Sequence, residues 1–249
     1  MSRVIKCAQT NDLWLAAHAG RITASCFDSL LAPPTTRQST RGGVVWPAGT
    51  EAAAKSDLRR ELIVERITGE NVTHVVTDYM RDGSAREPYA RAVYAAINGV
   101  RVIHASAVAS PEDESFRPDL AGFILHPQWD WFGASPDGLI GDDGGLELKN
   151  PSQMTHDSYW QDINLLVDKY KWQCLGNLIC EPLREWWDLC SFHDLFPSQY
   201  MLLTAPRFHR SDWAETIAKI EDEAKLMNEQ VDAEIAKRGL PPTQWKILP

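Results

Sequence analysis

Apolar positions recur with a helical period in several long segments of the chain. In segment 50–67 they return every three or four residues, and Gly69 follows as a stop signal. The same period predicts helices over about 84–97 and 157–180. The longest pattern covers about 211–237 and predicts an amphipathic C-terminal helix that packs on the body of the protein or on a partner.

Short apolar and β-branched runs lie between these helices and predict strands. Two of them cover 100–104 and 122–125. Segment 138–150 has the form of a hairpin, because apolar residues flank the turn-forming sequence Gly-Asp-Asp-Gly-Gly. Two more strands are predicted over 186–192 and 200–204. This order predicts an α/β fold with a central mixed β-sheet flanked by helices.

Length and composition favour one domain. With 249 residues, of which 44% are hydrophobic, the chain can bury a sizeable core. We expect this core to span about 14–204, with the C-terminal helix added to it. Segment 32–49 is rich in Pro, Gly, Ser and Thr, and we expect it to be a long mobile loop, to which the sequence assigns no role.

Charge and cysteine content limit the classes of function. The net charge of −9 and the pI near 5.3 argue against a protein that coats nucleic acid by bulk attraction, although a groove can be locally basic. The 5 cysteines include no CxxC pair, which argues against zinc and iron–sulfur sites. Without a signal-peptide pattern or a run of roughly 18 apolar residues, we expect a soluble cytoplasmic protein with no membrane contact.

Candidate chemistry concentrates in the predicted hairpin, where Asp137 precedes the first strand and Glu147 and Lys149 lie on the second. Residues two apart in a strand point to the same side, so Glu147 and Lys149 share a face that Asp137 can approach. Carboxylate oxygens beside a substrate phosphate are what Mg²⁺ prefers. The metal would activate a water while Lys149 orients that water or neutralises charge on phosphorus, so the pattern predicts phosphodiester hydrolysis.

A solvated surface hairpin is the alternative interpretation. An isolated Glu-x-Lys pair on an exposed strand is commonly a same-face ion pair of little energetic value. The Pro136-Asp137 pair, placed at this distance before Glu147, favours the catalytic interpretation.

These residues resemble a known nuclease motif. Pro136-Asp137 followed by Glu147-Leu148-Lys149 is similar to the PD-(D/E)XK motif, and the wider sequence SPDG…GLELK resembles its phage recombination branch, the lambda exonuclease or YqaJ-like alkaline exonucleases. The similarity spans roughly 14–204, apart from the segment after Leu31. It implies a restriction-endonuclease-like core.

The resemblance also implies a metal site. Asp137, Glu147 and the backbone carbonyl of Leu148 would bind Mg²⁺, for which Mn²⁺ may substitute, and Lys149 would position the nucleophilic water. Glu87 would be a further catalytic acid on a helix that faces the metal.

Two of the implied residues have structural alternatives. Ser84 and Glu87 also have the spacing of a capping box, in which Glu87 returns to the start of its helix. Gln173 would lie beside the active site, or else be an ordinary polar residue on an exposed helix face.

The resemblance further implies a pocket for the 5′-phosphate of a DNA end, to which Ser25 and Ser135 contribute. The position of the family's phosphate-binding arginine holds His18, with Arg21 three residues later. Either Arg21 substitutes or recognition of the end is weaker. Simple capping of a helix start is the alternative role for Ser25.

The function implied is a 5′-to-3′ exonuclease that digests one strand of linear double-stranded DNA to 5′ mononucleotides and leaves 3′ overhangs for phage-type recombination. The resemblance implies double-stranded DNA ends as substrate, a homotrimer, and a single-strand annealing protein as partner. The alternatives are an endonuclease or junction resolvase on the same core, and a non-catalytic DNA-binding domain that retains the motif.

Overall fold

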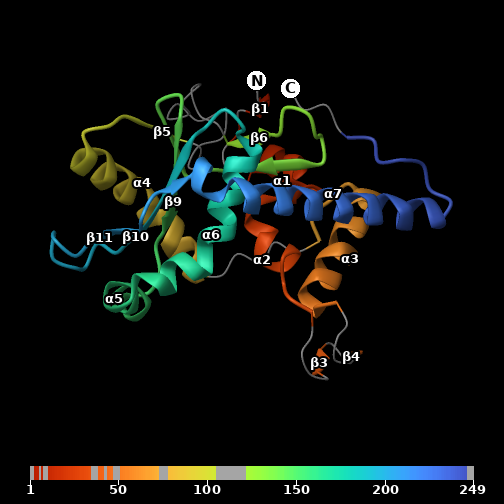
Figure 1. Ribbon diagram of the computed structural model, residues 1–249, viewed down its shortest axis with the longest axis horizontal. Helices are drawn as coiled ribbons and strands as arrows, with labels where there is room; N and C mark the ends of the chain where they lie inside the picture. The colour runs from red at the N-terminus through yellow and green to blue at the C-terminus, as the bar shows by residue number, and fades with distance from the viewer. Residues whose placement is uncertain are drawn as a thin grey trace.

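The computed structural model describes residues 3–5, 7, 11–34, 39–41, 44–46, 51–72, 78–104 and 122–245. Within these ranges the chain forms two mixed sheets, a separate two-stranded hairpin, and helices that cover the sheets (Figure 1). The predicted α/β class is confirmed, with the strands divided between two mixed sheets rather than gathered in one. There are two sheets because the strand at 123–125 pairs with residues 3–5 on one side and residues 132–134 on the other. Neither of these neighbours pairs with the sheet that contains the predicted hairpin.

The larger sheet contains the predicted hairpin. Its strand order is β11-β10-β9-β8-β5, with β12 also paired to β10, and only β9 and β10 run parallel. The strands are β5 (Val102–His104), β8 (Gly138–Ile140), β9 (Gly144–Lys149), β10 (Trp186–Phe192), β11 (Leu202–Thr204) and β12 (Phe208–His209). β9 is buried along nearly its whole length, as expected for a strand covered on both faces.

The smaller sheet has the order β1-β6-β7-β2. Its strands are β1 (Arg3–Ile5), β2 (Ile22–Thr23), β6 (Phe123–Leu125) and β7 (Phe132–Ala134). A Cβ at Gly133 would come within 2.4 Å of the Phe123 ring, so β7 can pair with β6 only because this residue is glycine.

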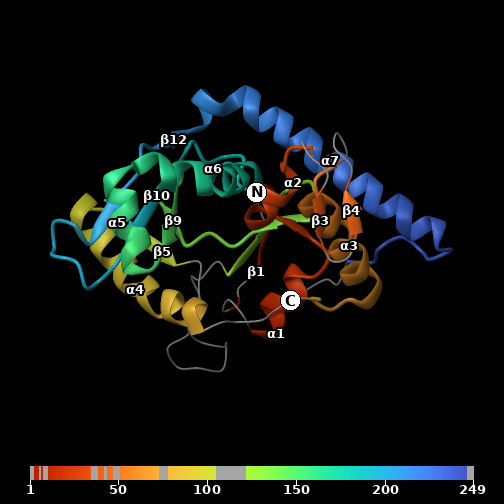
Figure 2. The same cartoon turned by 90° about the horizontal axis from the view of Figure 1, so that it is seen from below.

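Helices pack on both sides of the larger sheet. The helices of the described residues are α1 (Asp12–His18), α2 (Phe27–Leu30), α3 (Ala53–Thr68), α4 (Asp78–Asn98), α5 (Gln153–Gln161), α6 (Ile163–Cys180) and α7 (Ala214–Lys237), with the short 3₁₀ turns η1 (Ala24–Cys26) and η2 (Arg210–Trp213). α4 packs on β9 and β11, and α5 and α6 pack on β10. α6 crosses the middle of the molecule, and α4 and α3 lie at opposite ends (Figures 1 and 2).

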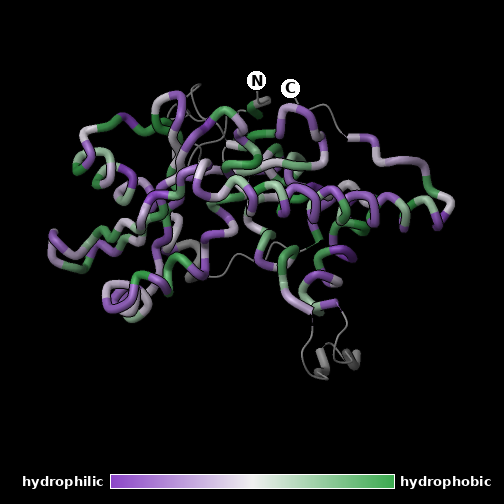
Figure 3. The backbone as a smooth tube through the Cα atoms, in the orientation of Figure 1, coloured by the Kyte–Doolittle hydropathy of each residue, from purple (hydrophilic) through white to green (hydrophobic). Residues whose placement is uncertain are grey.

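The C-terminal helix α7 packs on the body of the protein, against α3 and α6. Its apolar positions recur between polar ones along the tube in Figure 3. The positions buried by this packing are Ile217, Ile220, Ala224, Met227, Val231 and Ile235. Of the two expected roles, packing on the body is the one that the structure shows.

Two helix predictions need correction. α4 begins at Asp78 rather than near residue 84, which places Ser84 inside the helix and removes the capping-box explanation for Glu87. The segment predicted as one helix over 157–180 divides at Asp162, whose side chain accepts a hydrogen bond from the Asn164 amide (3.0 Å) and caps α6.

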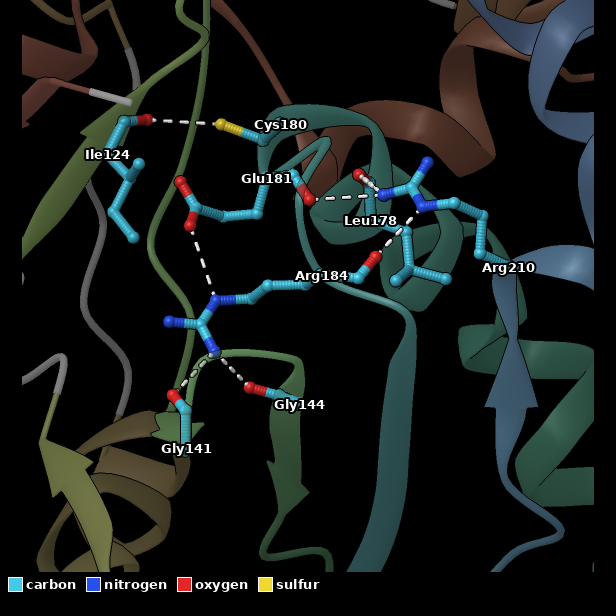
Figure 4. A network of polar contacts seen from close by, with 8 residues as sticks. All are labelled: Ile124, Gly141, Gly144, Leu178, Cys180, Glu181, Arg184 and Arg210. Carbon is cyan, nitrogen blue, oxygen red and sulfur yellow. Dashed lines mark hydrogen bonds and ion pairs between the residues drawn. The ribbon is translucent and has the colours of Figure 1, made fainter. Parts of the chain in front are cut away.

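Two arginines fix the turn of the hairpin to the C-terminal end of α6 (Figure 4). Arg184 Nη1 donates to the carbonyls of Gly141 (3.2 Å) and Gly144 (2.5 Å), while its Nε donates to Glu181 (3.3 Å). Arg210 in turn donates to the carbonyl of Arg184 (2.8 Å). These bonds hold the turn of the hairpin against the segment that follows α6.

Segment 32–49 was expected to be a loop, and part of it is regular. It contains the paired strands β3 (Ser39–Arg41) and β4 (Val44–Trp46), while 35–38, 42–43 and 47–49 lie outside the described residues. Over the part of the chain that the structure describes, no helix combines the length and apolar character needed to cross a membrane.

Candidate active site

The hairpin of β8 and β9, together with Asp137 before it, brings the predicted acids together; we call this unit the catalytic hairpin. Gly138 pairs with Leu146, so the chain just before β8 lies beside the end of β9. The amide of Leu148 donates to Asp137 Oδ2 (2.7 Å). The turn therefore places Asp137 next to the Glu-Leu-Lys segment, as the spacing predicts.

Glu147 is buried, with 1% of its surface exposed. Its two oxygens accept from different elements: Oε1 from Lys149 Nζ (2.6 Å) and Oε2 from Asn177 Nδ2 of α6 (2.9 Å). Burial raises the pKa of Glu147, and the neighbouring carboxylate of Asp137 raises it further, against the opposing effect of Lys149.

Lys149 has two hydrogen bonds and one ring contact. Besides Glu147, its Nζ donates to Gln173 Oε1 (2.9 Å) and lies 4.7 Å from the centre of the Tyr170 ring. Burial by itself would lower the pKa of Lys149, but the carboxylates of Glu147 and Asp137 outweigh it and raise the pKa above its ordinary value. The side chain is therefore a charged donor at neutral pH, and Gln173 lies beside the site.

Glu87 reaches the catalytic hairpin from α4. It is buried and pairs with Arg91 (Oε1 to Nη2, 2.5 Å), whose Nε donates to the backbone carbonyl of Asp137 (2.9 Å). Glu87 and Lys149 line one cavity of about 340 Å³. The other residues that line it are Gly83, Ser84, Leu148, Asn150, Pro151, Thr155, Lys169 and Tyr170.

The oxygen donors of the catalytic hairpin fit a hard divalent cation. Asp137 and Glu147 offer carboxylate oxygens and Leu148 a backbone carbonyl, which are the ligand types of Mg²⁺. Two neighbouring carboxylates, one of them buried, repel each other in a way that a cation would relieve. Within the described ranges, no three side chains of His, Cys, Asp or Glu form a closed metal cluster, so waters and a substrate phosphate would complete the shell.

Ser135 and His18 both contact Trp14. Trp14 Nε1 donates to Ser135 Oγ (2.8 Å), which donates to the carbonyl of Gly122 (3.0 Å). The His18 ring lies against Trp14, with centroids 4.3 Å apart, and against Phe123. The structure therefore brings together two of the residues predicted to hold a 5′-phosphate.

Ser25 lies on η1, where it is exposed and shares a hydrogen bond with the hydroxyl of Thr23 (3.0 Å). η1 packs closely on α6, since a Cβ at Gly176 would come within 2.8 Å of the Ala24 Cα. The hydroxyl of Ser25 is thus held near the helix that carries Gln173.

Arg21 has a structural position instead of the predicted one. Its guanidinium donates to the carbonyls of Ala17 (2.6 Å) and Asp130 (2.7 Å) and lies 4.6 Å from the centre of the Trp245 ring. With 5% of its surface exposed, it could meet a DNA phosphate only if these contacts opened. The structure argues against Arg21 as a substitute for the family's phosphate-binding arginine.

Comparison with known proteins identifies the family of the chain. Residues 13–181 match the YqaJ-like viral recombinase domain. The chain belongs to this family. No curated protein matches the chain at a significant level.

Solved structures similar to this YqaJ-like chain are exonucleases. The alkaline exonuclease LHK-Exo from Laribacter hongkongensis is 28% identical, with a TM-score of 0.70, and the match covers 92% of this chain and 96% of the other. Its complex with dAMP is also 28% identical, with a TM-score of 0.70 and coverage of 91% and 95%. A phage-related exonuclease from Haemophilus somnus 129PT shares the fold at 12% identity, with a TM-score of 0.62 and coverage of 88% and 96%.

The site of this YqaJ-like chain also includes residues that sequence reasoning missed. Tyr170 and Asn177 flank Gln173 on one face of α6, at spacings of three and four, and both contact the motif residues. Arg91 follows Glu87 by one helical turn. The helical period was the only signal for them, because it places Tyr170 and Asn177 on the face of Gln173 without showing what that face meets.

Asp28 of α2 is a further acidic residue near the site. Burial raises its pKa, and the ammonium groups of Lys149, Lys169 and Lys171 act in the opposite direction. Asp28 is exposed and lies within electrostatic range of these three lysines, although nothing in its sequence singled it out.

Proposed function

We propose that this chain is a Mg²⁺-dependent 5′-to-3′ exonuclease that digests one strand of linear double-stranded DNA to 5′ mononucleotides. The observation that carries the proposal is the contact of Asp137 with the Glu147-Leu148-Lys149 segment, beside a cavity lined by Lys149 and Glu87, in a member of the YqaJ-like family. That the chain is a deoxyribonuclease with exonuclease activity follows from its family and from its likeness to the Laribacter alkaline exonuclease.

The protein side chains divide the work of hydrolysis. Asp137, Glu147 and the Leu148 carbonyl would hold Mg²⁺, which when bound polarises the phosphodiester and makes a water acidic enough to attack. Lys149, kept charged by its carboxylate neighbours, orients that water or offsets negative charge that develops on phosphorus. Gln173 accepts from the Lys149 ammonium and thereby fixes its direction.

The 5′-to-3′ polarity is proposed from the family resemblance. Ser135 and Ser25 would bind the terminal phosphate, and His18, whose ring lies against Trp14 as Ser135 bonds to it, would take the place of an arginine. A protonated or neutral imidazole offers fewer donors than a guanidinium, so preference for a 5′-phosphate over a 5′-hydroxyl should be modest. The homotrimer, the single-strand annealing partner and the bacterial or phage-infected cytoplasm are proposed from the family resemblance.

Time-resolved digestion of labelled DNA tests this function. Purified protein with Mg²⁺ or Mn²⁺ is incubated with linear duplexes labelled at the 5′ or the 3′ end, and separately with covalently closed circles. We expect early release of 5′-labelled mononucleotides and intact circles. Cut circles would instead assign the chain to the endonuclease or resolvase class, and no cleavage with either metal would leave a DNA-binding domain.

A further inference from the structure

Arg91 lies one turn after Glu87 on α4 and joins that residue to the catalytic hairpin. Its Nη2 donates to Glu87 Oε1 (2.5 Å), and its Nε donates to the backbone carbonyl of Asp137 (2.9 Å). Arg91 is 3% exposed, so both bonds lie away from bulk water, where they are stronger than at a surface. One side chain thus sets the place of Glu87 relative to Asp137.

We propose that Arg91 is a positioning residue that holds Glu87 beside the metal-binding carboxylates, an inference that rests on the proposed function. A guanidinium is planar and has donors on three nitrogens, so it can bind two acceptors on different elements at once. A lysine at this position would keep the positive charge, but its single nitrogen on a different stem would not reproduce both bonds. The position therefore requires the planar shape of the guanidinium as well as its positive charge.

The charges around the cavity give Arg91 a second effect. Glu87, Asp137 and Glu147 are three carboxylates, and Lys149 and Arg91 are the cations that bond to this group in the contacts described above. Removing Arg91 takes one positive charge from this group and leaves the Glu87 carboxylate without its bond to the Arg91 guanidinium. A Glu87 side chain that is no longer held in place cannot support a metal ion.

The docking of α4 does not depend on Arg91. One turn further along the helix, the Tyr94 hydroxyl donates to Asp188 of β10 (2.5 Å), and Tyr94 and Ala90 are buried against β9 and β10. These contacts should keep the helix in place when Arg91 is changed. A local effect on the site can therefore be separated from loss of the fold.

The variants Arg91→Lys and Arg91→Met test the inference, with Arg86→Met as the matched control. Arg86 lies on the same helix, but its partner is the exposed Asp194 (3.2 Å). Calorimetric titration with Mg²⁺ in the absence of DNA, and kcat and KM on linear duplex DNA, are measured for each. Both Arg91 variants should bind Mg²⁺ and turn over about 10-fold to 100-fold less well, the range seen when partners of metal ligands are lost. KM for DNA should stay near the wild-type value, and the control should match wild type throughout.

A double variant shows whether Arg91 acts through Glu87. If it does, Glu87→Gln combined with Arg91→Met should be no slower than the worse single variant. Multiplied losses in the double variant, or Mg²⁺ affinity unchanged in both Arg91 variants, would overturn the inference. A wild-type protein that binds Mg²⁺ but cleaves no DNA would overturn the proposed function instead, and the Mg²⁺ titrations would still decide the role of Arg91.

Discussion

At the scale of single residues, the site depends on charges that are kept away from water. Lys149 stays protonated because Glu147 and Asp137 stabilise its charge by more than burial costs it. For Glu147 the effect of burial prevails, and it raises the pKa of the carboxyl group. A cation beside Asp137 and Glu147 would stabilise the ionised form of both, which is the physical reason to expect metal-dependent activity.

Replacing Lys149 by alanine should abolish measurable cleavage, a loss on the order of 10³-fold or more, because the charged donor beside the attacking water is gone. Folding and DNA binding should be largely retained, as checked by circular dichroism and by a gel-shift assay. Lys225→Ala, an exposed lysine of α7, is the control. An active, well-folded Lys149→Ala enzyme would remove Lys149 from the catalytic machinery.

The sequence identified those site residues whose relation is local. Asp137, Glu147 and Lys149 lie on one hairpin, so strand periodicity and a turn suffice to bring them together. Asn177 and Arg91 meet the hairpin only through the packing of separate helices, which no spacing reveals. Their detection requires the tertiary fold.

At the scale of elements, long periodic segments were predicted nearly to their ends, whereas some of the shortest strands were missed. β10 and α7 were predicted nearly to their observed ends, because burial of one face imposes a period over many residues. β2 and β7 are two and three residues long and carry no period. The start of α4 was missed because Pro88 lies inside the helix, where a sequence reading favours a start nearby.

The packing of α5 on β10 gives stability a pH dependence. His156 is fully buried, and its contact with the Tyr200 carbonyl (2.8 Å) assigns the proton to Nε2, so that Nδ1 accepts from the Ser191 hydroxyl (2.7 Å). The indole of Trp160 donates mainly to the same carbonyl (2.8 Å) and lies farther from Nε2 (3.2 Å). Burial lowers the pKa of His156 below its ordinary 6.5. The unfolded chain therefore binds this proton first as pH falls, and the stability present above pH about 6.5 is lost below it.

Urea denaturation at pH 7.5 and at pH 5.5 should show this effect as a lower free energy of unfolding at the acid pH. His156→Gln should be less stable at pH 7.5 but lose less on acidification. The exposed His209→Gln variant should behave as wild type. An equal loss on acidification in wild type and His156→Gln would assign the pH dependence to other groups.

At the scale of the whole molecule, α7 joins α3 to the helix that supports the site. Its buried face packs into the main hydrophobic core together with α6, and Met227 at its centre has no exposed surface. Truncation there removes buried volume that neighbouring helices cannot easily refill.

Met227→Ala should lower the free energy of unfolding by about 2–5 kcal/mol. The neighbouring Leu226 is 45% exposed, and Leu226→Ala should cost clearly less. Chemical denaturation of both variants measures the difference. Similar losses in the two variants would mean that α7 does not pack as described.

Leu148 is the central residue of the Glu-Leu-Lys segment, and its backbone and its side chain have different roles. Its carbonyl belongs to the candidate metal site, whereas its side chain is buried in a cluster with Tyr94 and Phe192. Because every residue has the carbonyl, mutational tolerance at this position is set by the volume and shape of the side chain alone. Other apolar residues can therefore replace Leu148 without changing the metal ligand. The residue type at position 148 should depend on how α4 packs and not on the substrate of the enzyme.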